Sequence, residues 1–245
     1  MNHDNFGDRM KGYEHASRQT LPRRMPVILR VDGRAFHTLT AKCARPFDAG
    51  VSRAMDATAR SLCEEIQGAV FAYVQSDEIS VLIHNYKRLN SDAWFGNEVQ
   101  KMVSVSASIA TRAFNVAAPE YLRLATFDSR VFVVPEAEVA NAFVWRQKDA
   151  QRNAVQMIAR AHFSHKECDR KSCRELTAIL EGRGVSLDSY AIGDRRGRSV
   201  YRVPHITPIS AVTTNEFWVD HAMPLIQEDR AHVERWLAVE AEEAA

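Results

Sequence analysis

The chain has 245 residues, of which 46% are hydrophobic and 26% charged, with 10 glycines, 8 prolines and a formal net charge of +1. This composition is typical of a globular protein and excludes fibrous, collagen-like and wholly disordered chains. No apolar run reaches the roughly 18 residues that a membrane-spanning helix needs. The first residues are polar, which does not suggest a secretory signal, and the four cysteines form no CxxC pair. We therefore expect a cytoplasmic protein with reduced thiols.

Hydrophobic periodicity and turn signals predict the elements of the first half of the chain. In chain order these are an amphipathic stretch at 4–18, a strand at 27–31, a helix capped by Asp48 and running to about 66, strands at 69–75 and 78–83, a helix at about 97–115 and a strand at 131–134. From the first strand onward, the order is that of a split βαβ, or ferredoxin-like, unit. We therefore predict an α+β fold, with an antiparallel sheet and two helices on one face.

The second half of the chain is predicted to be mainly helical. Helices are expected at about 136–161 and 171–182, and a late strand at about 199–203. Between Trp145 and Arg202 there are thirteen lysines and arginines against seven aspartates and glutamates. Such a local excess can hold a polyanion, and a solvated helix face with a basic loop explains the charge equally well.

Acidic residues follow the strands that such a sheet places at its centre. Asp32 ends the first strand, and Asp77 and Glu78 lie where the second and third strands meet. The first and third strands are neighbours in this topology, so we expect these acids to lie together. Paired carboxylates bind Mg²⁺, and Gly33 would let a phosphate or a metal approach the backbone. Taken singly, Asp32 reads as a turn cap and Asp77-Glu78 as a solvated hairpin tip; their matched positions favour a metal site.

Several longer motifs identify a family. They are Arg30-Val31-Asp32-Gly33-Arg34-Ala35-Phe36-His37, Arg45-Pro46-Phe47-Asp48 and Gln75-Ser76-Asp77-Glu78-Ile79-Ser80, together with the run from Gly7 to Glu14, Trp94-Phe95, Gln100-Lys101, Phe127-Asp128-Ser129-Arg130 and Trp145-Arg146-Gln147-x-Asp149. In this order they resemble the tRNA(His) guanylyltransferase family. The resemblance is greatest to its bacterial and archaeal guanylyltransferase-like 3′-to-5′ RNA polymerases. It extends from residue 6 to about residue 170 and is loose in the C-terminal quarter.

The resemblance implies a palm-type catalytic core in which Asp32, the backbone carbonyl of Gly33 and Asp77 hold two Mg²⁺ ions. It further implies a nucleotide site made of Asp32, Gly33, Arg34, Ala35, Phe36, His37, Arg45, Ser76, Asp77 and Lys101, in which Arg45 and Lys101 contact the triphosphate. Asn97 and Glu98 stand where the family has a basic pair, which removes part of that triphosphate contact. Glu78 is open to a structural role, as a residue that orients the metal ligands.

The activity implied is nucleotidyl transfer to the 5′ end of tRNA in the 3′-to-5′ direction, by two-metal catalysis. GTP or another nucleoside triphosphate would be the substrate, and ATP could activate the 5′ end. Residues 1–135 would form the palm-type catalytic domain. Residues 136–245 would form a mainly helical region for RNA binding and oligomerisation, packed on the palm as one unit. We expect RNA contacts from Arg146, Arg152, Asn153 and Lys171, and a homotetramer.

Two alternative functions stay open from the sequence. A palm-type nucleotidyl cyclase would use the same two acids and Mg²⁺, and a catalytically silent RNA-binding protein could keep the fold. The cluster His162, His165, Cys168 and Cys173 holds zinc-ligand residue types, but it lacks two close pairs separated by a loop, so we expect no structural metal there.

One departure from the family concerns RNA choice. Gln151-Arg152-Asn153-Ala154 stands where eukaryotic members have His-Ile-Asn-Asn. Selective RNA reading needs side chains placed against the edges of unstacked bases, as in an anticodon loop. We therefore predict that this chain does not depend on the histidine anticodon.

Overall fold

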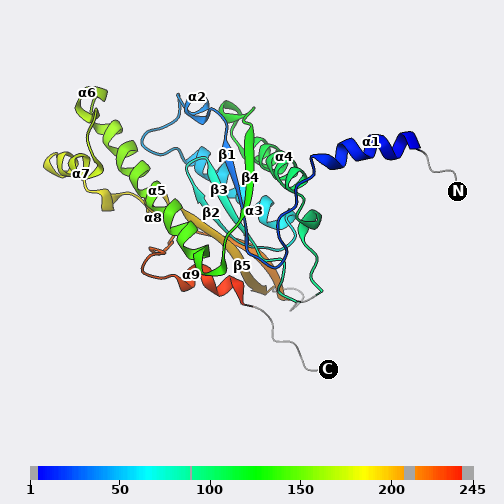
Figure 1. Cartoon of the computed structure of the whole chain (residues 1–245). Coiled ribbons are helices and arrows are strands. Elements are labelled where there is room, and N and C mark those ends of the chain that lie inside the picture. The colour runs from blue at the N-terminus through cyan, green and yellow to red at the C-terminus, as the bar shows by residue number, and fades with distance from the viewer. Residues whose placement is uncertain (1–4, 89, 207–212, 239–245) are drawn as a thin grey trace.

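The computed structural model of the chain describes residues 5–88, 90–206 and 213–238. A six-stranded antiparallel sheet with the order β4-β1-β3-β2-β5-β6 forms its centre (Figure 1). The strands are β1 (Val27–Gly33), β2 (Ala69–Gln75), β3 (Glu78–Ile83), β4 (Phe127–Val133), β5 (Arg198–Ile206) and β6 (Thr213–Asp220). The α-helices are α1 (Asn5–Ala16), α2 (Phe36–Leu39), α3 (Ala49–Glu65), α4 (Val99–Ala117), α5 (Val139–His162), α6 (His165–Cys168), α7 (Cys173–Gly182), α8 (Ile192–Arg196) and α9 (Ala231–Glu234). The predicted α+β fold is confirmed.

Helices α3 and α4 cover one face of the sheet, as the split βαβ order predicts. Asp48 caps α3, since its Oδ1 accepts hydrogen bonds from the backbone N–H groups of Gly50 at 2.8 Å and Val51 at 3.1 Å. The buried side of α3 includes Ala54, Met55 and Leu62, at the predicted helical spacing. These residues join one face of the strands in the largest apolar cluster of the described residues.

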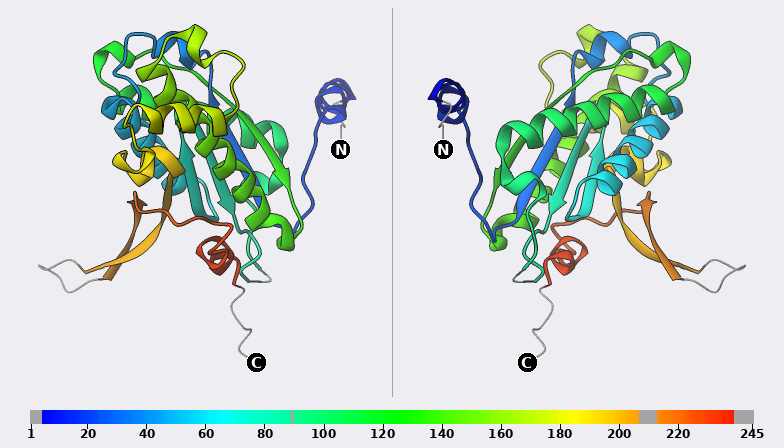
Figure 2. Two further views of the ribbon diagram at one scale, coloured as in Figure 1. Left: turned by 90° about the vertical axis from the view of Figure 1, so that its left-hand side faces the viewer. Right: turned by 90° about the vertical axis from the view of Figure 1, so that its right-hand side faces the viewer.

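Helix α5, from the predicted helical C-terminal region, covers the opposite face of the sheet. Its Val139, Phe143 and Ala150 pack in a second cluster with β-strand residues such as Phe71 and Leu82. Figure 2 shows α5 in front in the left view, and α3 and α4 in front in the right view. Strand β3 is buried along its whole length and β2 at all but one position. Nearly continuous apolar strands of this kind are typical of a sheet that is covered on both faces.

The C-terminal region adds two strands to the sheet. The late strand predicted at 199–203 is β5, which pairs with β2 from Phe71 to Val74. Strand β6 was not predicted; it pairs with β5 and forms one edge of the sheet, opposite the β4 edge. Phe217 of β6 is buried whereas Trp218 is 61% exposed, an alternation that suits an edge strand with one face on the core.

Two helical parts extend from the body. Helix α1 stands apart from the sheet on one side, and α6 and α7 lie at the far end of α5 on the other (Figure 1). Leu176 and Leu180 of α7 pack with Ile158 of α5 in a small third cluster. Among the described residues, no helix is long and apolar enough to cross a membrane.

Candidate active site

Asp32 and Asp77 meet at one end of the two central strands. Asp32 is the register partner of Glu78 in the β1–β3 ladder, and the N–H of Gly33 donates a 3.0 Å hydrogen bond to the carbonyl oxygen of Asp77. Strand β1 ends here, and β3 begins here after the turn at Ser76 and Asp77. The predicted juxtaposition of the acids is thus present in the structure.

Gly33 is required by the side chain that packs over it. A Cβ at this position would lie 2.3 Å from Cδ2 of Phe36, far inside van der Waals contact. Phe36 is buried, with its ring centroid 5.2 Å from those of both Phe114 and Phe127. Between Gly33 and Phe36 in the chain, Ala35 has a positive φ of 55°, which turns the backbone from β1 into α2. The backbone after Asp32 therefore folds tightly under the acids.

A cavity of about 500 Å³ opens beside these acids. Eight of the ten residues predicted to bind the nucleotide line it: Asp32, Gly33, Ala35, Phe36, His37, Arg45, Ser76 and Asp77. The side chains of His37, Arg45 and Ser76 are exposed. The cavity can hold a nucleoside triphosphate near two carboxylates, with an arginine at its edge.

Two predicted nucleotide contacts lie outside this cavity. Arg34 is exposed, and its N–H donates to the carbonyl of Thr126 at 2.9 Å. Lys101 lies 3.7 Å from Glu98 in the first turn of α4, next to Asn97, whose side chain accepts from Asn85 beyond the far end of β3. The structure thus places Lys101 at the opposite end of the sheet from the cavity of its own chain, and its contact with a triphosphate stays a prediction.

The loop that forms the outer wall of the cavity is held by Asp48. Besides capping α3, this carboxylate accepts hydrogen bonds from the N–H of Ala44 at 3.0 Å and the hydroxyl of Tyr121 at 3.3 Å. Burial raises the pKa of Asp48, but the hydrogen bonds from Ala44, Val51 and Gly50 outweigh it, so the pKa lies below its ordinary value. Asp48 is therefore an ionised structural residue at neutral pH.

The residues at the sheet end suit a metal that is shared with substrate phosphates. Burial raises the pKa of Asp77, and the nearby charges of Asp32 and Glu78 raise it further, so a cation would relieve this crowding. Among the described residues, no group of three or more His, Cys, Asp or Glu side chains could hold a metal alone. Mg²⁺ is commonly held by one or two carboxylates together with substrate phosphates and water. Asp32, Asp77 and the backbone of Gly33 fit that pattern.

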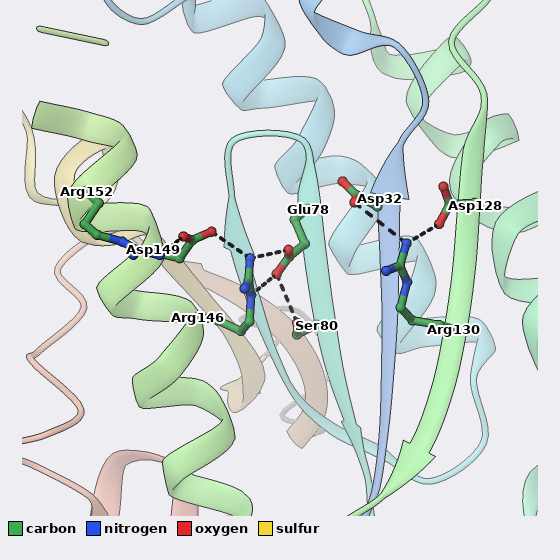
Figure 3. Close-up of polar contacts among 8 residues, drawn as sticks. All are labelled: Asp32, Glu78, Ser80, Asp128, Arg130, Arg146, Asp149 and Arg152. Carbon is green, nitrogen blue, oxygen red and sulfur yellow. Dashed lines mark hydrogen bonds and ion pairs between the residues drawn. The ribbon is translucent and has the colours of Figure 1, made fainter. Parts of the chain in front are cut away.

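Arg146, predicted to bind RNA, is instead bound within the protein. Its Nε and Nη2 donate to the two carboxylate oxygens of Glu78 at 2.7 and 2.6 Å, and Nη2 donates to Asp149 at 2.9 Å (Figure 3). Its side chain is only 12% exposed. Because the guanidinium is used internally, Arg146 is not a surface cation for RNA.

The other predicted RNA contacts lie in different places. Arg152 is 61% exposed on α5 and pairs with Asp149. Asn153 lines the cavity beside the acids, so it faces the nucleotide site. Lys171 is exposed just before α7, at a smaller surface pocket that also includes Arg160 and Arg170.

The inner wall of the cavity includes residues that were not predicted to be site residues. Gln75 is 4% exposed and its Oε1 has no hydrogen-bond partner. Asp194 lines the cavity beside Arg198, which is buried and paired with Asp56. That ion pair joins residues 142 positions apart, so no local sequence signal could reveal it.

The residues predicted not to bind zinc have ordinary partners where the structure shows them. His162 Nε2 lies 2.9 Å from the hydroxyl of Tyr190. Cys173 Sγ lies 3.9 Å from the carbonyl oxygen of Arg152.

Comparison with known proteins gives a consistent result. The family model described as tRNAHis guanylyltransferase matches residues 7–135, more than half of the chain. The chain is 32% identical over 152 residues to the tRNA(His) guanylyltransferase of Schizosaccharomyces pombe, which covers 59% of this chain and 56% of that protein. It is 27% identical over 203 residues to an uncharacterised protein of Acanthamoeba polyphaga mimivirus, covering 72% and 69%. The chain spans about half the length of the curated tRNA(His) guanylyltransferases that it matches.

Among solved structures, a bacterial tRNA(His) guanylyltransferase-like protein in complex with ATP is 40% identical to this chain. The match covers 96% of this chain and 100% of that one, with a TM-score of 0.88. The tRNA(His) guanylyltransferase of Saccharomyces cerevisiae is 20% identical with a TM-score of 0.64, which shows a shared fold. From the motifs, the arrangement of the acids and these matches together, we conclude that the chain belongs to the tRNA(His) guanylyltransferase family.

Proposed function

We propose that this chain is a nucleotidyltransferase that adds nucleotides to the 5′ end of tRNA in the 3′-to-5′ direction. The observation that carries the proposal is the meeting of Asp32, Gly33 and Asp77 at the side of a cavity of about 500 Å³. The names of the relatives support tRNA as the substrate class. The related bacterial structures, with ATP in one and GTP in the other, support nucleoside triphosphates.

In this reaction, the 3′-hydroxyl of the incoming nucleotide attacks an activated 5′-phosphate of the RNA. A new phosphodiester bond forms, and pyrophosphate leaves a triphosphate end or AMP leaves an adenylylated end. Bound Mg²⁺, two ions per site, would lower the pKa of the attacking hydroxyl and neutralise the charge of the leaving group. Asp32, Asp77 and the carbonyl of Gly33 would hold the ions.

Other residues of the chain would bind and orient the substrates. Arg45, exposed at the cavity, offers a positive charge to the triphosphate, and His37 and Ser76 offer hydrogen-bonding groups to the nucleotide. Exposed Arg152 and Lys171, on α5 and just before α7, are suited to phosphates of the RNA backbone. These contacts position the RNA without selecting its sequence.

We also propose a homotetramer. Helix α1 stands apart from the sheet, and its Phe6, Met10 and Tyr13 are 64%, 41% and 71% exposed. They recur at the spacing of one helix face, so a second copy of the chain could cover them.

The test is to incubate the protein with Mg²⁺, labelled GTP and a 5′-truncated tRNA. Extended tRNA supports the proposal, a cyclic nucleotide would identify a cyclase, and RNA binding without product would identify a silent RNA-binding protein. Parallel reactions on monophosphate and triphosphate 5′ ends, with and without ATP, show how the end is activated.

A further inference from the structure

Four carboxylates crowd the catalytic end of the sheet, although the proposed metal site uses only two. Asp32 on β1 is the register partner of both Glu78 on β3 and Asp128 on β4. Directly opposite residues of an antiparallel sheet point to the same face, with Cβ atoms about 5 Å apart, and like charges there repel. Asp77 adjoins this row, immediately before Glu78. If all four carboxylates were equally free of ion-pair partners, their positions would not determine which of them bind a metal ion.

Glu78 is bound on both of its oxygens by one arginine. Arg146 of α5 donates from Nε to Oε1 at 2.7 Å and from Nη2 to Oε2 at 2.6 Å, while Ser80 Oγ lies 3.5 Å from Oε1 (Figure 3). The Glu78 and Arg146 side chains are only 9% and 12% exposed, so water has little access to the ion pair and does not compete for its hydrogen bonds. A two-pronged bond of this kind fixes both partners in direction as well as distance.

Arg146 is in turn held in place from its own helix. Its Nη2 donates to Asp149 at 2.9 Å, and its guanidinium lies 4.6 Å from the centre of the Trp145 ring. Asp149 also pairs with Arg152. The contact therefore links a fixed point on α5 to the residue that directly follows Asp77.

Asp128 has an arginine partner of its own. Arg130 lies two positions along β4 and donates to Asp128 at 2.9 Å, whereas its nearest approach to Asp32 is 4.0 Å (Figure 3). Both side chains are about half exposed, so this pair is weaker than the buried one. Within the described part of the chain, no arginine or lysine forms an ion pair with Asp77.

We propose that Arg146 and Arg130 are positioning residues that bind Glu78 and Asp128, and so leave Asp32 and Asp77 as the carboxylates available to the metal ions. This inference rests on the proposed metal site. Arg146 makes the larger contribution because its pair is buried and two-pronged. Holding Glu78 also fixes the start of β3, and with it the direction of Asp77.

The test measures binding of Mn²⁺ alone to the full chain by electron paramagnetic resonance, alongside nucleotide addition. In Arg146→Gln, a positive charge is lost and the Glu78 carboxylate is freed beside Asp32. We expect Mn²⁺ to bind at least fivefold more tightly, or with an additional ion, while nucleotide addition falls at least tenfold. If Arg146 had only a structural role, Arg146→Gln would weaken Mn²⁺ binding and nucleotide addition together.

Two further variants keep the test decisive if Arg146→Gln does not fold. Glu78→Gln should weaken Mn²⁺ binding by no more than tenfold, because it removes a nearby negative charge but not a ligand. The double variant Arg146→Gln/Glu78→Gln has the same formal charge as the wild type and should return Mn²⁺ affinity to within twofold of it. Arg112→Gln, which removes an exposed ion pair with Glu65, is the matched control and should leave Mn²⁺ binding unchanged.

The outcomes distinguish failure of the proposed metal site from failure of the proposed role of Arg146. A wild type that binds no Mn²⁺ would overturn the proposed metal site, and the inference with it. If the wild type binds Mn²⁺ but Arg146→Gln binds it equally or more weakly, or Glu78→Gln loses more than tenfold in affinity, only the role of Arg146 is overturned.

Discussion

At the end of β1, a residue with a proposed metal-binding role lies next to a residue with a packing role. Asp32 faces the cavity, while Gly33 leaves room for the Phe36 ring that packs against Phe114 and Phe127. We therefore expect substitution of Asp32 to affect the reaction and substitution of Gly33 to affect stability.

Asp32→Ala and Asp77→Ala are each expected to reduce nucleotide addition to below a few per cent of the wild-type rate. Each removes a carboxylate that would hold a metal, and loss of one such electrostatic group costs at least about a hundredfold. Both acids lie at strand ends, so the melting temperature should change little. Rates at saturating Mg²⁺ and thermal melts check this, with Glu65→Gln as a surface control; substantial residual activity in either variant would contradict the two-metal assignment.

Gly33→Ala is expected to lower the free energy of unfolding by about 1–3 kcal/mol, because the new Cβ would overlap the buried ring of Phe36. Gly12→Ala in α1 is the matched control, since nothing lies within 4 Å of its added Cβ. Urea denaturation of the two variants gives the comparison. Equal stability of Gly33→Ala and the wild type would mean that Phe36 can move aside at no cost.

At the scale of elements, the outer wall of the cavity depends on the start of α3. Asp48 holds the helix end and the preceding loop with one carboxylate. Loss of this side chain should therefore affect a helix and the nucleotide site together.

Asp48→Ala is expected to cost about 1–2 kcal/mol of stability at pH 7. The pKa of Asp48 is lowered in the folded chain, so its contribution is fully present above its ordinary value of 3.8 and is lost as pH falls through the lower folded value. The difference between variant and wild type should thus shrink below about pH 4 in unfolding measurements across pH. Ser172→Ala, which removes the cap of α7 away from the cavity, should leave nucleotide binding unaffected.

We also expect helix α5 to affect which RNA is used. Its Asn153 and Ala154 line the cavity, and they belong to the run in which this chain departs from the pattern expected of eukaryotic family members. We expect this chain to extend several 5′-truncated tRNAs by pairing with the opposite acceptor strand. Comparing tRNA(His) carrying its own anticodon with tRNA(His) carrying an exchanged one tests this. A rate that drops a hundredfold on exchange would restore strict dependence on the histidine anticodon.

The elements that the sequence predicted are those with strong local signals. Strand β1 is an apolar run ended by Asp-Gly, the turn Ser76-Asp77 separates the apolar strands β2 and β3, and α3 has a clear cap and period. Strand β6 was missed because an edge strand buries only one face and so has a weak apolar pattern. The burial of Arg146 could not be predicted either, because its partner Glu78 is 68 positions away and only the packing of α5 on the sheet brings them together.

At the scale of the whole molecule, we expect α1 to form the interface of the proposed tetramer. Phe6→Ser/Tyr13→Ser should lower the mass measured by light scattering below that of a tetramer, since it removes apolar area that a second copy would bury. Val116→Ser, at a 79% exposed site on α4, serves as the control. A tetramer that survives the double substitution would place the interface elsewhere.

The cavity has two walls of different origin in the chain. The acids and the loop up to Asp48 belong to residues 7–135, which the family model matches, whereas the facing wall comes from α5, α8 and the start of β5, between Ala150 and Arg198. Mutations in the second wall can therefore change which substrate enters without altering the groups that would perform the chemistry. Enzymes with one reaction and different RNA preferences could diverge from this fold by changing that wall alone.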